Sequence, residues 1–306
     1  MEPIDHAPEE IVTLRDIVRY AASRFNEAGL VFGHGTDNAI DEAAALALHA
    51  LHLPADLPDL YWGARLTRAE RDAVMARVRR RIEERLPLPY ITHETYFAGL
   101  PFYVDQRVLV PRSPLAELIE RGFQPWLDPD SVEAVLEIGT GSGCIAVACA
   151  YAFPAAAVDA TDTDADALEV AAVNVRRHDL EDRVALRHAD LYEGLPPRRY
   201  QLIVTNPPYV DAHAMAELPP EYRHEPRHAL AAGDDGLAVV RRILRGAGDR
   251  LTADGILVVE VGDAEDAVAE AFGHLPLTWL TLERGGFGVF LLTGEQLHEA
   301  AAAGAL

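Results

Sequence analysis

The sequence predicts a doubly wound α/β fold with a mostly parallel sheet, preceded by a small N-terminal helical bundle. Three observations lead to this prediction. From about residue 134 onward, strand-like runs alternate with helix-like runs, as in sheets whose strands are connected by helices on both faces. Before residue 90, apolar residues recur at helical spacing. Near the C-terminus, two strand-like runs flank Arg284-Gly285-Gly286 and predict an antiparallel edge hairpin.

The N-terminal bundle is expected to contain three helices. Capping boxes open the first and the third, at Thr13 with Asp16 and at Thr67 with Glu70. The helices are predicted from Thr13 to a stop at Gly29, from about Asp37 to an end before Pro54, and from Thr67 to Leu86. The third is rich in arginine, but interleaved acids favour a solvated face over an RNA contact.

Strand-like runs around Ala98-Gly99 and Asp105-Gln106 predict a hairpin that links the bundle to the larger domain, where Ser113 caps a further helix. The 306 residues thus divide into a helical bundle over 1–90, a β-hairpin linker over 91–112 and a larger domain over 113–306. The expected strands are 134–138, 156–161, 184–188, 201–205 and 255–261, the expected helices 143–152, 165–178, 235–250 and 264–273, and the final hairpin joins 277–283 to 287–293. The Ala-rich C-terminus is expected to be frayed.

Charge and composition exclude several classes of protein. Acids at Glu2, Asp5, Glu9 and Glu10 argue against an export signal, and no apolar run approaches the ~20 residues of a membrane span. We therefore expect a cytoplasmic protein without membrane contact. Residues 113–306 hold 32 acids and 14 arginines, a net charge of −18. Such a domain should repel a phosphate backbone, so direct nucleic-acid binding is not expected and a basic protein partner fits better.

No metal site is predicted. Cys144 and Cys149 lie five residues apart in one predicted helix, a spacing that suits neither a zinc site nor a disulfide framework. His224 and His228 are four apart, but the prolines around them argue against a helix that would bring them together. We interpret these histidines as surface or substrate-loop residues.

The first motif with chemical meaning is Glu137-Ile138-Gly139-Thr140-Gly141-Ser142-Gly143, at the end of the first strand of the sheet. Its three glycines permit a tight turn and a close approach of a ligand to the backbone ahead of a helix N-terminus. The dinucleotide fingerprint would require glycine at position 144, where this chain has Cys144. The loop thus predicts a bound cofactor, but not one held by a pyrophosphate.

Two carboxylates follow at neighbouring strand ends. Asp162 closes the second strand, where it could accept both hydroxyls of a ribose, whereas Asp164 and Asp166 are better explained as acids at a helix start. Asp190 follows the third strand and could accept the exocyclic amine of an adenine. Glu137 could hold an amino group of the same ligand, or could serve the backbone of the glycine loop.

The second motif is Asn206-Pro207-Pro208-Tyr209, directly after an apolar strand. An amide nitrogen is a weak nucleophile because its lone pair is delocalised. The Asn206 side-chain oxygen and the Pro207 carbonyl can each accept one N–H of a planar NH₂ group, which orients the nitrogen for attack. The prolines stiffen this arrangement and Tyr209 offers a flat apolar wall. The motif predicts a site for an amide or an aromatic amine.

With these two motifs the chain resembles the protein-glutamine N(5)-methyltransferase family of class I, Rossmann-like methyltransferases that depend on S-adenosyl-L-methionine. The resemblance covers nearly the whole chain. The segments Val108–Pro114 and Glu221–Pro226 are most similar to the branch that acts on large-subunit ribosomal protein three. The release-factor branch is the alternative; it typically has an acid-containing stretch where Ser113-Pro114-Leu115 stands here.

The resemblance implies a role for each site residue. The N-terminal bundle would recognise the substrate, and 113–306 would be the catalytic domain. S-adenosyl-L-methionine, which leaves as S-adenosyl-L-homocysteine, would be held by Glu137, Gly139, Thr140, Gly141, Gly143, Asp162, Asp190 and Asn206. Asn206, Pro207, Pro208 and Tyr209 would bind the glutamine amide and carry catalysis, with Phe97 and Arg112 near the mouth. The expected partner is a basic ribosomal protein, free or in pre-ribosomal particles during ribosome biogenesis.

Two functions of other classes stay open at this point. Adenine N6-methylation of DNA or RNA poses the same chemical problem, but it calls for a basic groove that the acidic larger domain does not offer. A non-catalytic scaffold that binds S-adenosylmethionine would not need Asn206 or the glycine loop, and both are intact.

Overall fold

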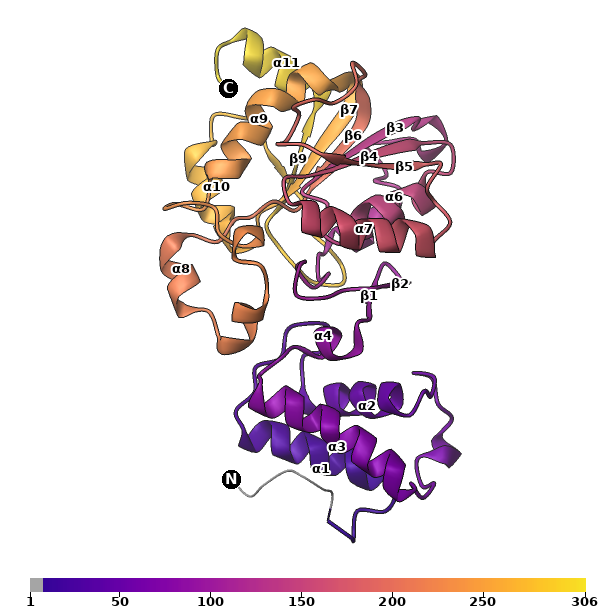
Figure 1. Ribbon diagram of the computed structural model, residues 1–306. Coiled ribbons are helices and arrows are strands. Elements are labelled where there is room, and N and C mark those ends of the chain that lie inside the picture. The colour runs from indigo at the N-terminus through magenta and orange to yellow at the C-terminus, as the bar shows by residue number, and fades with distance from the viewer. Residues whose placement is uncertain (1–7) are drawn as a thin grey trace. The chain divides into compact units, whose positions relative to one another are not determined.

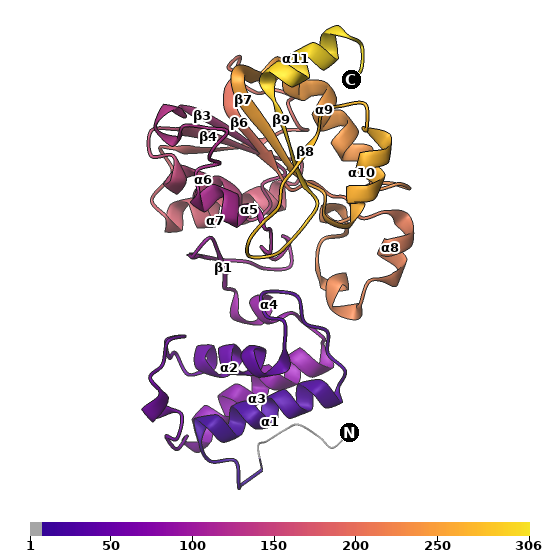
Figure 2. The same ribbon diagram turned by 180° about the vertical axis from the view of Figure 1, so that it is seen from behind.

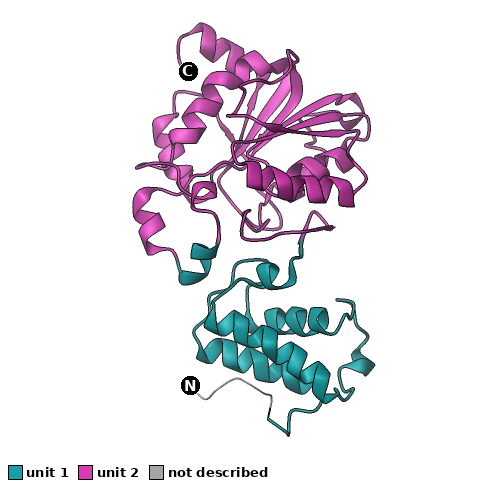
Figure 3. Ribbon diagram, in the orientation of Figure 1, with its two compact units in different colours: residues 1–95, 219–224 teal, residues 96–218, 225–306 magenta. Residues whose placement is uncertain are grey.

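The computed structural model describes residues 8–306, so the acids expected to exclude an export signal at Glu2 and Asp5 lie outside the described residues. The described chain forms two compact units (Figure 3), one containing the residues up to Thr95 together with Pro219–His224, the other containing 96–218 and 225–306. Among the residues that the structure describes, no helix has the length and apolar character needed to cross a membrane.

In the part that the structure describes, the first unit contains four α-helices and two short 3₁₀ segments, of which the second is Pro220–His224 (Figure 1). The other elements are α1 (Leu14–Glu27), α2 (Ala39–Ala50), α3 (Arg68–Glu83), α4 (Leu88–Thr92) and the 3₁₀ turn Asp59–Tyr61. The predicted capping boxes at Thr13 and Thr67 are both confirmed, since each threonine accepts a backbone N–H and each acid three residues later returns the bond. Apolar faces of α1, α2 and α3, including Ile17, Leu46 and Val78, bury one common core.

Buried charges hold the segment 219–224 in this unit. Arg81 is only 1% exposed, and its side chain donates to Glu42 at 2.6 Å and lies 3.6 Å from Glu221. Glu221 is fully buried, pairs with Arg85 at 2.8 Å and accepts the backbone N–H of Val31 at 3.1 Å. Because a lone buried charge is costly, each of these residues depends on the others.

The second unit contains a seven-stranded sheet in the order β5-β4-β3-β6-β7-β9-β8. Its strands are β3 (Ala134–Ile138), β4 (Ala157–Asp162), β5 (Val184–His188), β6 (Tyr200–Thr205), β7 (Leu251–Glu260), β8 (Thr278–Trp279) and β9 (Val289–Thr293). The first five pair in parallel, and β9 pairs antiparallel with both β7 and β8. The predicted α/β fold with an antiparallel edge is confirmed.

Helices cover both faces of this sheet (Figure 2). One face packs on α5 (Leu115–Glu120), α6 (Cys144–Ala152) and α7 (Ala165–Arg177), the other on α9 (Ala238–Arg250), α10 (Glu265–Ala271) and α11 (Gly294–Ala302). Within β3, Val135 belongs to the first core while Leu136 belongs to the second, as the two-residue period of a strand requires. Strands buried on both faces explain the continuous apolar runs in the sequence.

Several local predictions were wrong. The predicted linker begins with the helix α4, and its hairpin is short, with β1 (Thr95–Phe97) paired to β2 (Leu100–Phe102) across Ala98-Gly99 and no strand at Asp105-Gln106. The strand expected over 277–283 is reduced to the two residues of β8. The helix α11 was not expected; Thr293 caps it with Gln296, a Thr-x-x-Gln box that the sequence displays, and it extends into the Ala-rich C-terminus as far as Ala302. The short helix α8 (Ala212–Glu217) was not expected.

Removing the charge of Arg81 should destabilise the first unit strongly. Arg81→Met leaves the buried Glu42 without its cation and leaves Glu221 with Arg85 alone. We expect a loss of about 3–5 kcal/mol in the free energy of unfolding, measured by urea unfolding followed by circular dichroism. The matched control is Arg80→Met, because Arg80 pairs with Glu84 on the surface at 3.2 Å and should cost at most about 1 kcal/mol. Equal losses in the two variants would contradict this account.

Candidate active site

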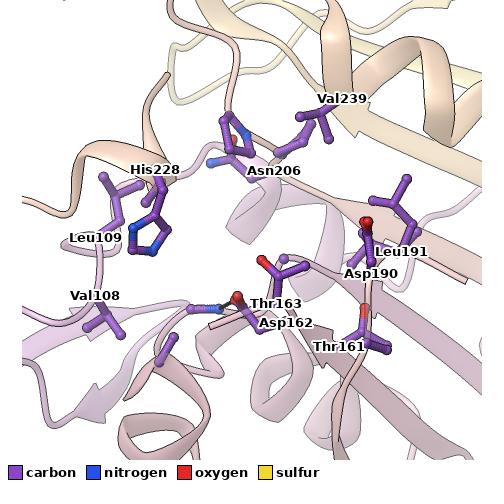
Figure 4. A pocket seen from close by; sticks show the side chains of 18 of the residues that line it. Val108, Leu109, Thr161, Asp162, Thr163, Asp190, Leu191, Asn206, His228 and Val239 are labelled. Atoms are coloured by element: carbon purple, nitrogen blue, oxygen red, sulfur yellow. Dashed lines mark hydrogen bonds between the residues drawn. The ribbon is translucent and has the colours of Figure 1, made fainter. Parts of the chain in front are cut away.

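A cavity of about 310 Å³ lies at the carboxyl edge of the parallel strands. Parallel strands place the residues that follow them at one edge, where open α/β sheets bind their ligands. The ends of β3, β4, β5 and β6 contribute Gly139, Gly141, Asp162, Asp190 and Asn206 to the wall. Arg107, His228 and Arg242 of α9 are further polar residues of the wall. Figure 4 shows Asp162, Asp190 and Asn206 around this cavity, with Val108 and Leu109 along another side.

The glycine loop forms one wall of the cavity with bare backbone. Gly139 and Gly141 have φ values of +73° and +52°, which disfavour any side chain, and a Cβ placed on either would meet no other heavy atom within 4 Å. Gly143 has a different role, because a Cβ there would lie 3.2 Å from the Cβ of Ala171 on α7. The first two glycines thus open the backbone to a ligand, while the third permits close packing of the start of α6 against α7.

Glu137 and Thr140 are both buried and serve the loop itself. The Thr140 hydroxyl donates to Glu137 Oε2 at 2.5 Å, and the same oxygen accepts the backbone N–H of Ala146 at 2.9 Å. Burial raises the pKa of Glu137 to about 8, although these two hydrogen bonds oppose the shift. Two roles were expected for Glu137. These contacts support the role of stabilising the backbone of the glycine loop, whereas a contact with the ligand's amino group stays a prediction.

Asp162 and Asp190 both line the cavity, each with a protein partner of its own. Asp162 accepts the backbone N–H of Gly141 with one oxygen and that of Asp164 with the other, both at 2.9 Å. A carboxylate has about four acceptor positions, so these bonds fix its orientation and leave it able to accept ligand hydroxyls. Asp190 is paired with Arg242 of α9 at 2.8 Å, a partner that the sequence did not indicate.

A second cavity of about 150 Å³ adjoins the first and shares Leu109, Asn206, Pro207 and Ala229 with it. The rest of its wall includes Arg112, Tyr209 and Glu260. The Tyr209 ring lies over Gly262, where an added Cβ would come within 2.9 Å of the ring. Arg112 is held by Glu225 through two hydrogen bonds, at 2.5 and 2.8 Å. Asn206 and Pro207 therefore stand where the two cavities meet.

Sequence reasoning missed Glu260, the last residue of β7. It is 4% exposed, lines the second cavity together with Asn206 and accepts a hydrogen bond from the Ser113 hydroxyl. Asn206 and Glu260 directly follow Thr205 and Val259, which are in register on β6 and β7. The sequence did contain a signal for Glu260, namely an acid at the end of an apolar strand, as at Asp162. It was overlooked because no motif accompanies it.

Three further residues considered in the sequence analysis, Phe97, His224 and His228, lie in different parts of the structure. Phe97 lies in the apolar core beside α5 and α6 and is not among the cavity-lining residues, so its contact with substrate stays a prediction. His224 belongs to the first unit, where its Nε2 contacts the Glu84 carbonyl at 2.8 Å. His228 lines the first cavity and pairs with Asp164 at 2.9 Å.

Comparisons with known proteins find similarity to methyltransferases. Residues 123–221 match the family model described as the methyltransferase small domain. A protein of Neisseria meningitidis serogroup B named ribosomal protein uL3 glutamine methyltransferase is 50% identical over 294 residues, covering 96% of this chain and 97% of its own. A Bordetella pertussis protein of the same name is 51% identical over 291 residues, covering 95% and 98%. A solved methyltransferase from Pyrococcus furiosus aligns with a TM-score of 0.47 and 20% identity, covering 64% and 89%.

The buried Glu137 should make the stability of the protein depend on pH. Its ordinary pKa is 4.5 and its folded pKa is about 8, so between these values the folded state keeps a proton that the unfolded state has released. Its contribution is therefore complete below pH 4.5 and is lost as the pH rises towards 8, with a slope of up to about 1.4 kcal/mol per pH unit. Glu137→Gln should flatten this slope in urea unfolding measured from pH 5 to 8.

The exposed Glu133 provides the matched control for this measurement. Glu133→Gln should leave the pH slope of the wild-type protein unchanged. A Glu137→Gln slope as steep as that of the wild-type protein would show that the buried carboxyl is not the titrating group.

Proposed function

The chain belongs to the family of ribosomal protein uL3 glutamine methyltransferases, and from this premise we propose that it transfers a methyl group from S-adenosyl-L-methionine to the side-chain amide nitrogen of a glutamine in ribosomal protein uL3. The observation that carries the proposal is the pair of adjoining cavities with Asn206 and Pro207 in their shared wall. A cofactor in the larger cavity and an amide in the smaller one would meet at these two residues.

The residues of the larger cavity suit S-adenosyl-L-methionine. Gly139 and Gly141 leave the loop backbone open to the ligand, and Asp162 is oriented by two backbone N–H groups to accept the ribose hydroxyls. Apolar side chains, including Leu109, Leu191 and Val239, offer surfaces for the flat base. When bound there, the cofactor supplies a methyl group on a positively charged sulfur.

The smaller cavity suits a primary amide. The Asn206 side-chain oxygen and the Pro207 carbonyl would each accept one N–H of the substrate, which holds the nitrogen in place and raises its electron density. Tyr209, fixed over Gly262, would pack against the planar amide. The proton of the product nitrogen can leave after transfer, so the site needs no strongly basic group.

The charge of the chain supports a basic protein as partner. The net charge is −22, with −18 of it in residues 113–306, and opposite charges speed the association of two proteins and favour the correct partner. A ribosomal protein substrate would be methylated in the cytoplasm, either free or in a pre-ribosomal particle.

Asp162 provides a test of the cofactor site by binding alone. Asp162→Asn removes a charged acceptor of hydrogen bonds, which are worth about 1.5–3 kcal/mol each, and should weaken binding of S-adenosyl-L-homocysteine in calorimetry by roughly 10- to 100-fold. The matched control is Asp166→Asn, because Asp166 is an exposed acid in the first turn of α7 and is not among the residues that line the cavity. If both variants bind the ligand equally well, Asp162 does not hold the ribose.

The methylation itself is tested with methyl-labelled S-adenosyl-L-methionine and unmethylated uL3, with peptide mass spectrometry to locate the label. We expect the label on a glutamine of uL3, and a rate at least about 10²-fold lower for Asn206→Ala because one of the two acceptors is lost. Release factor and adenine-containing nucleic acid serve as competing substrates. Label on either of these, and none on uL3, would overturn the proposed substrate.

A further inference from the structure

A buried carboxylate stands beside the asparagine at the junction of the two cavities. Glu260 accepts a hydrogen bond from the Ser113 hydroxyl. It lies beside Asn206, because Thr205 on β6 is in register with Val259 on β7 and the residue that follows each of them lines the smaller cavity. A hydrogen bond with the Asn206 side chain lowers the pKa of Glu260. Ser113 Oγ also accepts the backbone N–H of Leu115 at 3.1 Å, so its own proton is directed to Glu260. The carboxylate is therefore held on one side by the start of α5, and its other contact is with Asn206.

This contact decides which end of the Asn206 amide faces the substrate. An asparagine side chain has an NH₂ group that only donates and an oxygen that only accepts, and an ionised carboxylate only accepts. Asn206 must therefore present its NH₂ group to Glu260. Rotation of the amide by 180° would place oxygen against oxygen, so an ionised Glu260 excludes the reversed orientation.

We propose that Glu260 is a positioning residue, which fixes the side-chain amide of Asn206 so that its oxygen accepts the N–H of the substrate amide. The inference rests on the proposed function and deepens it. Without Glu260 the amide could turn its NH₂ group toward the substrate, and a donor facing the N–H of another amide repels it.

The charges around Glu260 predict how the orientation of the Asn206 amide depends on pH. Burial raises the pKa of Glu260 to about 7, while the hydrogen bond from Ser113, the charge of Arg112 and the contact with Asn206 lower it. Arg112 is itself paired with Glu225, and Tyr209 lies in the wall of the same cavity. A protonated Glu260 could donate to the Asn206 oxygen and reverse the amide, so kcat should rise as the pH increases through about 7.

The first experiment is the pH profile of uL3 methylation by Glu260→Gln. Glutamine has nearly the same size, but it does not titrate and accepts either end of the Asn206 amide. We expect kcat to fall on the order of 10- to 100-fold, KM for S-adenosyl-L-methionine to stay near the wild-type value, and the rise of kcat through pH 7 to disappear. Glu133→Gln, at an exposed glutamate, should retain the wild-type profile.

A second variant separates positioning from mere packing. Ser113→Ala removes a hydrogen bond that lowers the pKa of Glu260, so the rise in kcat should persist and move to higher pH. Glu260→Gln with a wild-type kcat, or a pH profile that neither variant alters, would overturn the proposal.

The last measurement does not depend on substrate. The chain has four asparagines, so the NMR spectrum of the ¹⁵N-asparagine-labelled protein contains few side-chain NH₂ signals. The signal of Asn206 is identified as the one that is missing from the spectrum of Asn206→Ala. We expect it to shift through pH 7 in the wild-type protein and to stay constant in Glu260→Gln. Absence of uL3 methylation by the wild-type protein would refute the proposed function alone, whereas an Asn206 signal insensitive to Glu260 would refute the positioning role.

Discussion

The parallel pairing of β3 with both of its neighbours is the constraint on which the site depends. Ile138 is in register with Thr161 on β4 and with Thr205 on β6. The residues that follow are Gly139, Asp162 and Asn206, and they consequently emerge together at one edge of the sheet. A shift of one residue between two strands would turn their side chains to opposite faces. The two apolar cores fix this register, because each strand has buried residues on both sides.

The sequence predicted this part of the fold well because the relevant signals are local. β3 is followed by Gly139, and β4 and β7 end at the carboxylates Asp162 and Glu260. Asp164, for example, caps α7 as its place after β4 suggested. The helix α11 was missed although its capping box is visible, because the Ala-rich composition was given more weight than Thr293 with Gln296. A local sequence signal as weak as this one does not decide between a helix and a frayed end; the packing of α11 on β7 does.

Long-range partners were beyond the reach of the sequence. Glu221 joins the first unit by pairing with Arg81 and Arg85, more than 130 residues earlier in the chain. Four residues later, Glu225 pairs instead with Arg112 of the second unit. Both acids lie in one short polar segment that looks like a surface loop. Only the fold shows that each of these two acids is a buried carboxylate with an arginine partner distant in the sequence.

Three carboxylates near the ends of parallel strands show how surroundings set the role of one functional group. Glu137 is fully buried beside two donors that belong to the glycine loop, so it stabilises the loop. Asp162 is oriented by two backbone N–H groups and faces the larger cavity, which suits a ligand with hydroxyls. Glu260 contacts two side chains, Ser113 and Asn206, at the smaller cavity. Residue type and strand position are alike in all three, so the difference lies in which hydrogen-bond donors the fold brings to each carboxylate. Different surroundings give like groups different protonation states, and in this way one site obtains different functions from them.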